Sequence, residues 1–402
     1  MHVTRLRALL ISAVFIMPLA AGGAPAAPVT LHALVEQAWL RSPSLRGTAA
    51  RQGEVDAARA LSGSWVAGQP VLGLSQRSDR WSGQSGVRES EVSMSAPFWT
   101  PRQRNARRDL AEHSATELQA QVRKVRLDIA GEVRARLWDV ATAQALREEK
   151  EDHLHHIEEL ADEVRRRVAA GELARVDALL ADQEVQAARI AVEQTRAEAN
   201  ARLSKLRILA GPLGALPLEP EPLAAADTEN PRLQAARATQ IRAEAALRLA
   251  QASRSAPPTL ALSLRQEPDP LSGPERSVSL SLQVPIGSAG RNRPVEAQAQ
   301  TQIAVAAAEA QQTEEITQAE LDSARVQLEH ARAALSASGA RVSSMREHEQ
   351  LIEKAFRLGE RGLADLLRSR ALAHEAQVAR RQQEVALGRA HAQFNQASGV
   401  LP

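Results

Sequence analysis

The chain has 402 residues, of which 44% are hydrophobic but only 2% are aromatic, and it contains neither cysteine nor tyrosine. So few bulky side chains argue against a conventional globular core, and the missing cysteines exclude disulfides, thiolate metal sites and a lipid on an N-terminal cysteine. The 50 basic and 48 acidic residues nearly balance, which removes nucleic acid as an implied partner. The alanine-rich composition instead favours long helices packed as coiled coils.

The first residues have the pattern of a secretory signal. Arg5 and Arg7 form a basic start, residues 8–20 are mostly apolar, and small residues follow up to Ala26. We therefore expect a signal peptide at residues 1–26 that is cleaved on export. No stretch of the chain approaches the roughly 20 apolar residues that a membrane-spanning helix needs. A mature chain that spans a membrane would have to do so as a β-barrel.

An internal repeat organises the rest of the chain. A shift of 188 residues aligns the chain with itself from residue 43 to the end, and it places Pro43 on Pro231 and Gly171 on Gly359. One structural unit is therefore used twice. The expected division is a first module at 27–210, a proline-rich linker at 211–229 and a second module at 230–402.

Each module is expected to begin with a helix, at about 31–64 and about 231–253, where alanines and apolar residues follow helical spacing. Two short strands follow each helix. In the clearest of them, Val278, Leu280 and Leu282 share one parity and serines share the other, which predicts one apolar and one polar face. The strands are expected at about 70–77 and 88–97 in the first module and at about 258–265 and 276–285 in the second.

A long helical hairpin is expected after each strand pair. The segment 102–169 contains no proline and has a stripe of apolar residues at helical spacing. A helix through this segment would be roughly 100 Å long at about 1.5 Å per residue. Gly171 and Gly359 mark the reversals. The hairpins are expected at about 102–209 and about 291–397.

Four amphipathic strands cannot close a barrel alone, because the smallest membrane barrels use about eight and an open sheet edge cannot face lipid. Three chains would supply twelve strands, with the apolar parity facing lipid and the serines facing water. The expected fold class is therefore mainly α with a small β part, trimerising into a 12-stranded outer-membrane β-barrel with a periplasmic α-helical tunnel. Aromatic residues just outside the strands would lie at the membrane interfaces. These are Trp65, Trp81, Phe98 and Trp99.

The passage from strand to long helix in the second module, residues 285–291, combines proline, glycine and arginine in a way that resembles the TolC family of outer-membrane efflux proteins. The glycine-centred reversals and the duplicated plan resemble that family too, over almost the whole mature chain. Across the two modules, the residues expected at the passage from strand to helix are Pro97, Pro285, Gly290 and Arg291. The first module departs from the pattern, because Pro101 and Arg102 stand where the glycines would be; proline can still start a helix.

The resemblance implies a homotrimer embedded in outer-membrane lipid of a Gram-negative bacterium, which acts with a periplasmic adaptor and an inner-membrane RND-type pump. It also implies that the reversals are the tips that contact the adaptor. The tip residues are Ala170, Gly171, Glu172, Leu358, Gly359 and Glu360. The sequence around 165–172 is most similar to the heavy-metal branch, which handles cobalt, zinc and cadmium. Export of drugs or other organic compounds and a type I secretion duct stay open as alternatives.

Two further sets of residues are candidate sites. Asp177 and Asp365 each follow a reversal by six residues, so that three-fold symmetry would turn either into a ring of acids attracting cations; the alternative is an acid that stabilises a helix start. Arg368 stands where some family members carry a second acid. His153 and His156 share a helix face and are weak candidate metal ligands, although acidic neighbours also suit a solvated face.

No nucleotide-binding loop, zinc-protease motif or nucleophile elbow is present, so neither catalysis nor a cofactor is expected. The rival from another class is a periplasmic adaptor or a structural coiled-coil protein. Such a protein should have a compact β-domain beside one helical hairpin, whereas this sequence predicts two hairpins and four strands.

Overall fold

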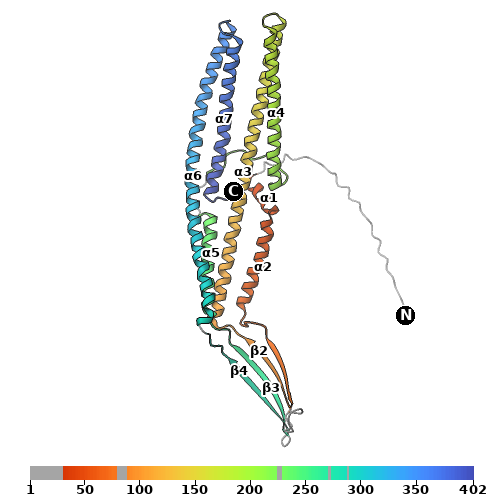
Figure 1. Ribbon diagram of the computed structural model, residues 1–402, viewed down its shortest axis with the longest axis vertical. Coiled ribbons are helices and arrows are strands. Elements are labelled where there is room, and N and C mark those ends of the chain that lie inside the picture. Colours follow the sequence, from red (N-terminus) through yellow and green to blue (C-terminus); the bar gives the residue numbers. More distant parts are fainter. Residues whose placement is uncertain (1–29, 79–87, 224–228, 270–272, 288) are drawn as a thin grey trace, which may run out of the picture.

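A computed structural model describes residues 30–78, 88–223, 229–269, 273–287 and 289–402. The predicted signal peptide, Trp81 and the rest of residues 79–87, and residues 270–272 lie outside these ranges. Figure 1 shows long helices on one side of a small sheet. The elements in chain order are α1 (Leu31–Arg41), α2 (Pro43–Gly63), β1 (Val71–Ser78), β2 (Arg88–Pro97), α3 (Pro101–Ala169), α4 (Arg175–Ala210), α5 (Pro231–Ala252), β3 (Thr259–Asp269), β4 (Gly273–Gln283), α6 (Ala289–Arg357) and α7 (Leu363–Ala397).

The predicted fold class, mainly helical with a small antiparallel sheet, is confirmed. The order of a helix, two strands, a very long helix and a shorter return helix occurs twice. Among the helices in the described residues, none has a stretch both long and apolar enough to cross a membrane.

The single helix predicted at 31–64 is wrong, because the structure has two helices there. Ser42 is extended, with φ −68° and ψ 135°, and separates α1 from α2. Pro43 explains the break, since a proline disfavours helical backbone at the residue before it and is well tolerated as the first residue of the next helix. The Ser42 side chain then caps α2 by accepting a hydrogen bond from the Ser44 N–H. The first module thus has one helix, α1, without a counterpart among the described residues of the second.

The four strands form one antiparallel sheet in the order β1-β2-β3-β4. β2 begins and ends where the alternation predicts, while β3 extends to Asp269 and β4 begins earlier, at Gly273. The central pair β2 and β3 joins the two modules, with Met94 opposite Leu262. Each residue opposes one of the same parity, so the alternation along each strand becomes two distinct faces of the sheet.

The long helices start immediately after the sheet. Thr100 caps α3 in a capping box with Gln103, and Pro101 is the first helical residue. α3 and α6 have 69 residues each, which corresponds to roughly 100 Å. α6 continues through Pro294, its sixth residue, although a proline has no N–H to donate to the carbonyl four residues earlier.

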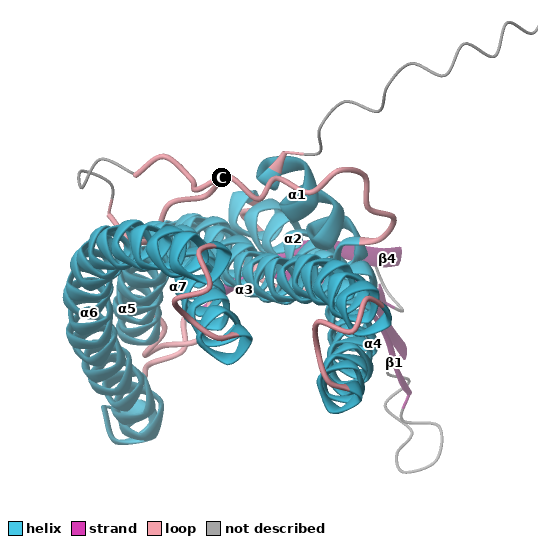
Figure 2. Ribbon diagram, turned by 90° about the horizontal axis from the view of Figure 1, so that it is seen from above, coloured by secondary structure: helices cyan, strands magenta, loops and turns pink. Residues whose placement is uncertain are grey.

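The helices form one curved layer, which is visible from above in Figure 2. In the half next to the sheet, α3 contacts α2 and α5, and α5 contacts α6; in the other half, α3 contacts α4 and α7, and α7 contacts α6. α3 therefore lies inside the layer along its whole length, and α6 lies at one edge.

The core consists mostly of small side chains between helices. The largest apolar cluster joins α1, α3 and α4 through Leu34, Val133 and Leu206, which are completely buried. Where α7 crosses α3, a Cβ on Gly388 would lie 1.9 Å from the Trp138 ring, so only glycine allows this close approach.

Candidate functional site

The sheet has one apolar face that no described part of the chain covers. Across the four strands, Leu72, Met94, Leu262 and Leu280 form one row of this face. Their side chains are 53% to 71% exposed. Neighbouring rows continue the face with Leu74, Val92, Leu264, Val278, Ala96, Leu260 and Leu282. Exposed apolar patches of this kind mark a surface that is covered in the working protein.

The opposite face is polar. Gly73, Ser93, Ser263 and Ser279 form the row next to the leucines, with hydroxyl groups in three of its four positions. Toward the far end of the sheet, Arg265 pairs with Glu89 at 2.7 Å and also with Glu267. One side of the sheet therefore suits a hydrocarbon environment and the other side suits water.

Both outer strands have an open edge. β1 pairs only with β2 and β4 pairs only with β3 among the described strands. A row of unpaired backbone N–H and C=O groups on each edge is a template for pairing with another strand. The helical layer is incomplete in a similar way, since Ile190 and Ile208 on α4 and Val326 on α6 are 52% to 78% exposed.

The aromatic residues near the sheet are placed differently from one another. Trp65 is 54% exposed and lies under the Arg104 guanidinium at 4.0 Å, which is a cation–π contact. Trp99 is only 8% exposed and lies under Arg107 at 3.7 Å. Burial lowers the pKa of Arg107. Trp65 thus suits the predicted interfacial position, whereas Trp99 packs at the start of α3 instead.

The predicted passage residues lie where the sheet meets the helices. Pro97 ends β2, Pro285 follows β4, and Gly290 and Arg291 lie in the first turn of α6. Gly287, within the predicted passage at 285–291, donates its N–H to the Ser255 hydroxyl at 3.1 Å, and its backbone passes too close to Arg254 for a Cβ.

Sequence reasoning missed Gln103. It is buried and donates from its side-chain amide to the Ser255 carbonyl at 2.8 Å, so that the first long helix is tied to the second module.

The two reversals at the far ends of the long helices have the same backbone geometry. Gly171 and Gly359 have φ of 81° and 77°. At the first reversal the Glu172 N–H donates to the Arg167 carbonyl at 2.9 Å, and at the second the Glu360 N–H donates to the Ala355 carbonyl at 2.9 Å. These are Schellman caps, in which the glycine ends the helix. No heavy atom lies within 4 Å of the Cβ position of either glycine, so both tips are open to a partner.

The tip residues beside the glycines are exposed. Ala170, Glu172 and Glu360 lie on the outside of the turns, and the Leu358 side chain is 65% exposed although it is apolar. An exposed leucine at a tip is apolar surface of the kind that contact with a partner would cover.

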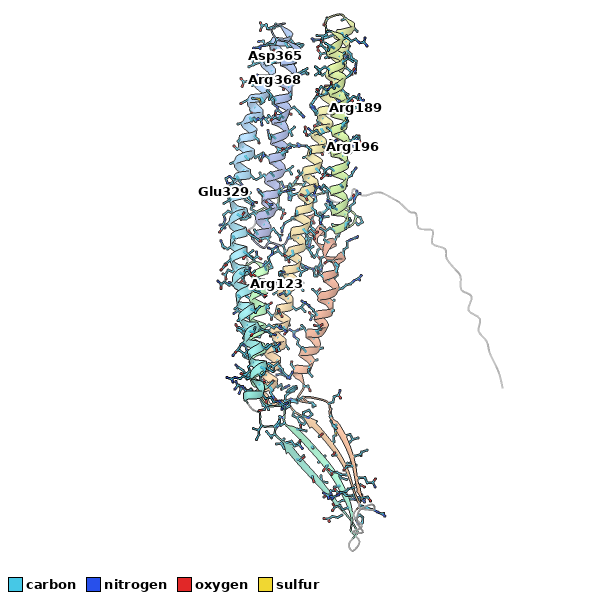
Figure 3. All side chains as sticks on the ribbon, in the orientation of Figure 1. Arg123, Arg189, Arg196, Glu329, Asp365 and Arg368 are labelled. Carbon is cyan, nitrogen blue, oxygen red and sulfur yellow. The ribbon has the colours of Figure 1, made fainter. Side chains whose placement is uncertain are left out.

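The two acids after the tips lie at helix starts. Asp177 accepts a hydrogen bond from the Ala174 N–H at 3.1 Å, which caps its own helix. Asp365 lies near Arg361, with 3.8 Å between a carboxylate oxygen and a guanidinium nitrogen, and it is one turn from Arg368 at the tip end of α7 (Figure 3). Asp177 therefore has a local structural role, whereas the Asp365 carboxylate is half exposed beside two arginines.

His153 and His156, the predicted weak metal ligands, contact different neighbours in the structure. His153 stacks on His374 of α7, with ring centroids 4.6 Å apart, and His374 bonds Glu149 at 2.9 Å. Burial lowers the pKa of His153, and electrostatic repulsion between the His153 and His374 rings lowers it further. His156 is 70% exposed and approaches Glu159. Within the described residues no group of three or more histidines and acids is arranged to hold a metal ion.

A buried ion pair fixes the linker to the helices. Arg134 of α3 is 2% exposed and donates to both carboxylate oxygens of Glu221, at 2.8 Å and 3.0 Å. It also donates to Gln396 and to the Val400 carbonyl. The repeat could have drawn attention to this position, because residue 322, the counterpart of Arg134, is an aspartate.

Comparison with known proteins supports a channel fold. Residues 34–212 match the family model described as outer membrane efflux protein. No curated protein sequence is similar at a significant level. Several solved structures are similar over nearly the whole chain, and three of them serve as examples. Their sequence identities are so low that the likeness shows the fold alone.

The outer membrane protein VceC of Vibrio cholerae is 15% identical, with a TM-score of 0.69, over 92% of this chain and 96% of VceC. The MtrE outer membrane channel of Neisseria gonorrhoeae is 17% identical, with a TM-score of 0.69, over 92% of this chain and 89% of MtrE. The CmeC outer membrane channel of Campylobacter jejuni is 13% identical, with a TM-score of 0.67, over 98% of this chain and 94% of CmeC. The chain thus has the fold of TolC-like outer membrane channels, and its first module matches the outer membrane efflux protein family.

Proposed function

We propose that this protein is the outer-membrane channel subunit of a tripartite efflux system and acts as a passive exit duct. The observation that carries the proposal is the sheet, which has an exposed apolar face, a polar face and two open edges. Three copies would pair β4 of one chain with β1 of the next and close a 12-stranded barrel, with the apolar face toward lipid. The helices of the three chains would continue the barrel as a periplasmic tunnel.

The rival reading as a periplasmic adaptor or structural coiled coil is not favoured, because one continuous sheet joins two helical hairpins. The test is cell fractionation followed by electrophoresis without heating. We expect an outer-membrane protein that migrates as a trimer and becomes a monomer of about 43.4 kDa or less after boiling. A soluble periplasmic monomer would contradict the proposal.

We further propose that the tips bind a periplasmic adaptor, which connects the duct to an inner-membrane RND-type pump. Support comes from the open surroundings of Gly171 and Gly359 and from the exposed Leu358. Replacing both glycines with aspartate is expected to abolish efflux and adaptor cross-linking while the trimer persists, because the tips lie far from the sheet (Figure 1).

A control for the added charge is aspartate at Gly47 or Gly53 of α2, which also have free space around them but not the positive φ of the tip glycines. Normal resistance and undiminished cross-linking in the double tip variant would show that the tip glycines are only helix caps.

For the substrate we propose heavy-metal cations, on the basis of the sequence around residues 165–172. Asp365 at three symmetric positions would attract cations, although the nearby Arg361 and Arg368 weaken that field. Drugs, other organic compounds and secreted proteins are the alternatives. A deletion strain is expected to lose resistance to zinc, cobalt or cadmium. Sensitivity confined to antibiotics would reject the metal assignment and leave the duct intact.

A further inference from the structure

The two long helices begin with an unusual concentration of arginine. The first eight residues of α3 contain Arg102, Arg104, Arg107 and Arg108, and the first turns of α6 contain Arg291 and Arg293. Neither helix has an acid in its first turn. Cations are unfavourable there, because the start of a helix carries a partial positive charge. The return helices α4 and α7 follow the usual rule and begin with Asp177 and Asp365.

These six arginines have no acidic partner within the described part of the chain, whereas most other helical arginines form ion pairs. Arg104 and Arg107 stack on Trp65 and Trp99. Arg102, Arg108, Arg291 and Arg293 are exposed and make no hydrogen bond or ion pair with any described residue. The first acid along each helix already has a partner: Asp109 of α3 pairs with Arg248 at 2.8 Å, and Glu296 of α6 pairs with Arg254 at 2.6 Å.

The arginines lie at one level of the molecule, beside the apolar face of the sheet. Ser255 ties the start of α3, through Gln103, to Gly287 just before α6, so that both helix starts meet at one loop. The adjoining residues of the second module, Val284 and Ile286, are 64% and 97% exposed although they are apolar. Both helix starts lie next to the sheet (Figure 1), so their arginines adjoin the exposed apolar residues at the end of β4.

We infer that these six arginines form a basic collar that binds the phosphate groups of anionic phospholipids in the leaflet next to the helices. The inference rests on the proposed position of the sheet in a membrane. Guanidinium groups bind phosphate oxygens through paired N–H donors, and the acyl chains of the same lipid would lie against the apolar face. An acidic protein would satisfy the charge alone, but it would leave Val284 and Ile286 uncovered.

The test measures which lipid the purified trimer retains. The detergent-solubilised trimer is mixed with equal amounts of dioleoyl phosphatidylglycerol and dioleoyl phosphatidylcholine, which share acyl chains and differ in net charge, and the retained lipid is quantified by mass spectrometry. The wild type is expected to retain mainly phosphatidylglycerol at low salt. The preference should shrink at high salt, because screening weakens contacts between exposed charges.

The decisive variant replaces the four exposed collar residues, Arg102→Gln, Arg108→Gln, Arg291→Gln and Arg293→Gln. We expect a loss of preference of roughly fivefold per arginine near the surface, and hence retention close to the mixing ratio. The matched control removes four exposed arginines away from the collar that also lack a partner among the described residues: Arg46→Gln, Arg51→Gln, Arg207→Gln and Arg332→Gln. It should keep the wild-type preference. The double variant Arg102→Gln/Arg293→Gln, which is less prone to misfold, should be intermediate.

Retention of both lipids at the mixing ratio by the wild type, or an unchanged preference in the fourfold and double variants, would overturn the collar and leave the channel proposal standing. Retention of neither lipid by a folded trimer would contradict the membrane position of the sheet, and the collar with it.

Discussion

The two helical hairpins come from the same repeated unit, yet different interactions hold their helices together. In the first hairpin, three arginine–acid pairs cross between α3 and α4 at steps of seven residues: Glu151 with Arg196 at 3.0 Å, Glu158 with Arg189 at 2.8 Å, and Arg165 with Asp182 at 2.5 Å. Figure 3 shows Arg189 and Arg196 along α4. We call these three pairs the ladder. The seven-residue step is typical of a coiled coil with flanking ion pairs.

The second hairpin has lost this ladder. The positions equivalent to Glu151 and Arg196 are Gly339 and Glu384, and those equivalent to Glu158 and Arg189 are Arg346 and Gln377. Between α6 and α7, Arg341 pairs with Glu375 at 2.7 Å and Arg370 approaches Glu349 at 3.9 Å. The positions equivalent to Arg165 and Asp182 are Glu353 and Arg370, so the charges of the third pair are exchanged. The comparison teaches that the two copies share the backbone plan, whereas the complete ladder occurs in only one of them.

The largest effect is expected where the two hairpins touch. Replacing Gly388 with alanine places a Cβ against the Trp138 ring, so α7 must move away from α3, at a cost of about 1–3 kcal/mol. The matched control, Gly339→Ala on α6, has free space and should gain up to about 1 kcal/mol from helix propensity. Thermal unfolding of both purified variants measures the difference. Equal stabilities would show that α3 and α7 do not pack closely.

A smaller effect is expected from reversing the ladder. In the double variant Arg189→Glu/Arg196→Glu, like charges face each other across α3 and α4, which should cost about 1–2 kcal/mol for half-exposed pairs. Adding Glu158→Arg and Glu151→Arg to this variant makes the facing charges opposite again and should restore its stability. Hydrogen exchange of the α3–α4 amides is the measurement.

The control for the ladder is Glu384→Arg on α7, which removes only a contact with Arg380 in the same helix. It should leave exchange in the α6–α7 hairpin nearly unchanged. If the α3–α4 amides exchange as fast in the variant with all four substitutions as in the double variant, the ladder does not set the register.

The smallest effect is a pH dependence at the seam between the hairpins. Because folding lowers the pKa of His153, the unfolded chain binds more protons as the pH falls below the usual value of about 6.5, and stability is lost there. The groups around the ring are Glu149, Lys150 and His156 on α3, His374 and Arg370 on α7, and Glu349 on α6.

The melting temperature of the wild type should therefore fall between pH 7.5 and pH 5.5. This fall should be smaller in His153→Gln and unchanged in the exposed control His155→Gln. The same drop in all three proteins would place the pH sensitivity elsewhere.

Strands and long helices could be predicted because their signals are local. Alternation of leucine and serine defines β4, and the absence of proline defines α3. The break at Ser42 was also signalled locally, by Pro43, but the helical spacing on both sides hid it. The contacts of Gly388 with Trp138, of His153 with His374 and of Arg134 with Glu221 could not be predicted, because each joins residues far apart in the chain.

The residues of the candidate site also fall into those that the sequence could predict and those that it could not. The glycines at the tips are recognisable from the repeat, since a Schellman cap requires a residue that tolerates positive φ. The different surroundings of Asp177 and Asp365 could not be predicted from the repeat, because they depend on which neighbouring group reaches each carboxylate. Adaptor contact and cation attraction at these residues stay predictions.

The central claim, that one face of the sheet meets lipid and the other meets water, is tested most directly at two neighbouring residues of β4. The chain has no cysteine, so Ser279→Cys and Leu280→Cys each introduce a single thiol without background. With a small, charged, membrane-impermeant maleimide applied to isolated outer membranes, we expect rapid labelling at residue 279. Residue 280 should be labelled only after the membrane is dissolved in detergent. Equal labelling of both residues in intact membranes, or faster labelling at residue 280, would contradict the proposed orientation of the sheet.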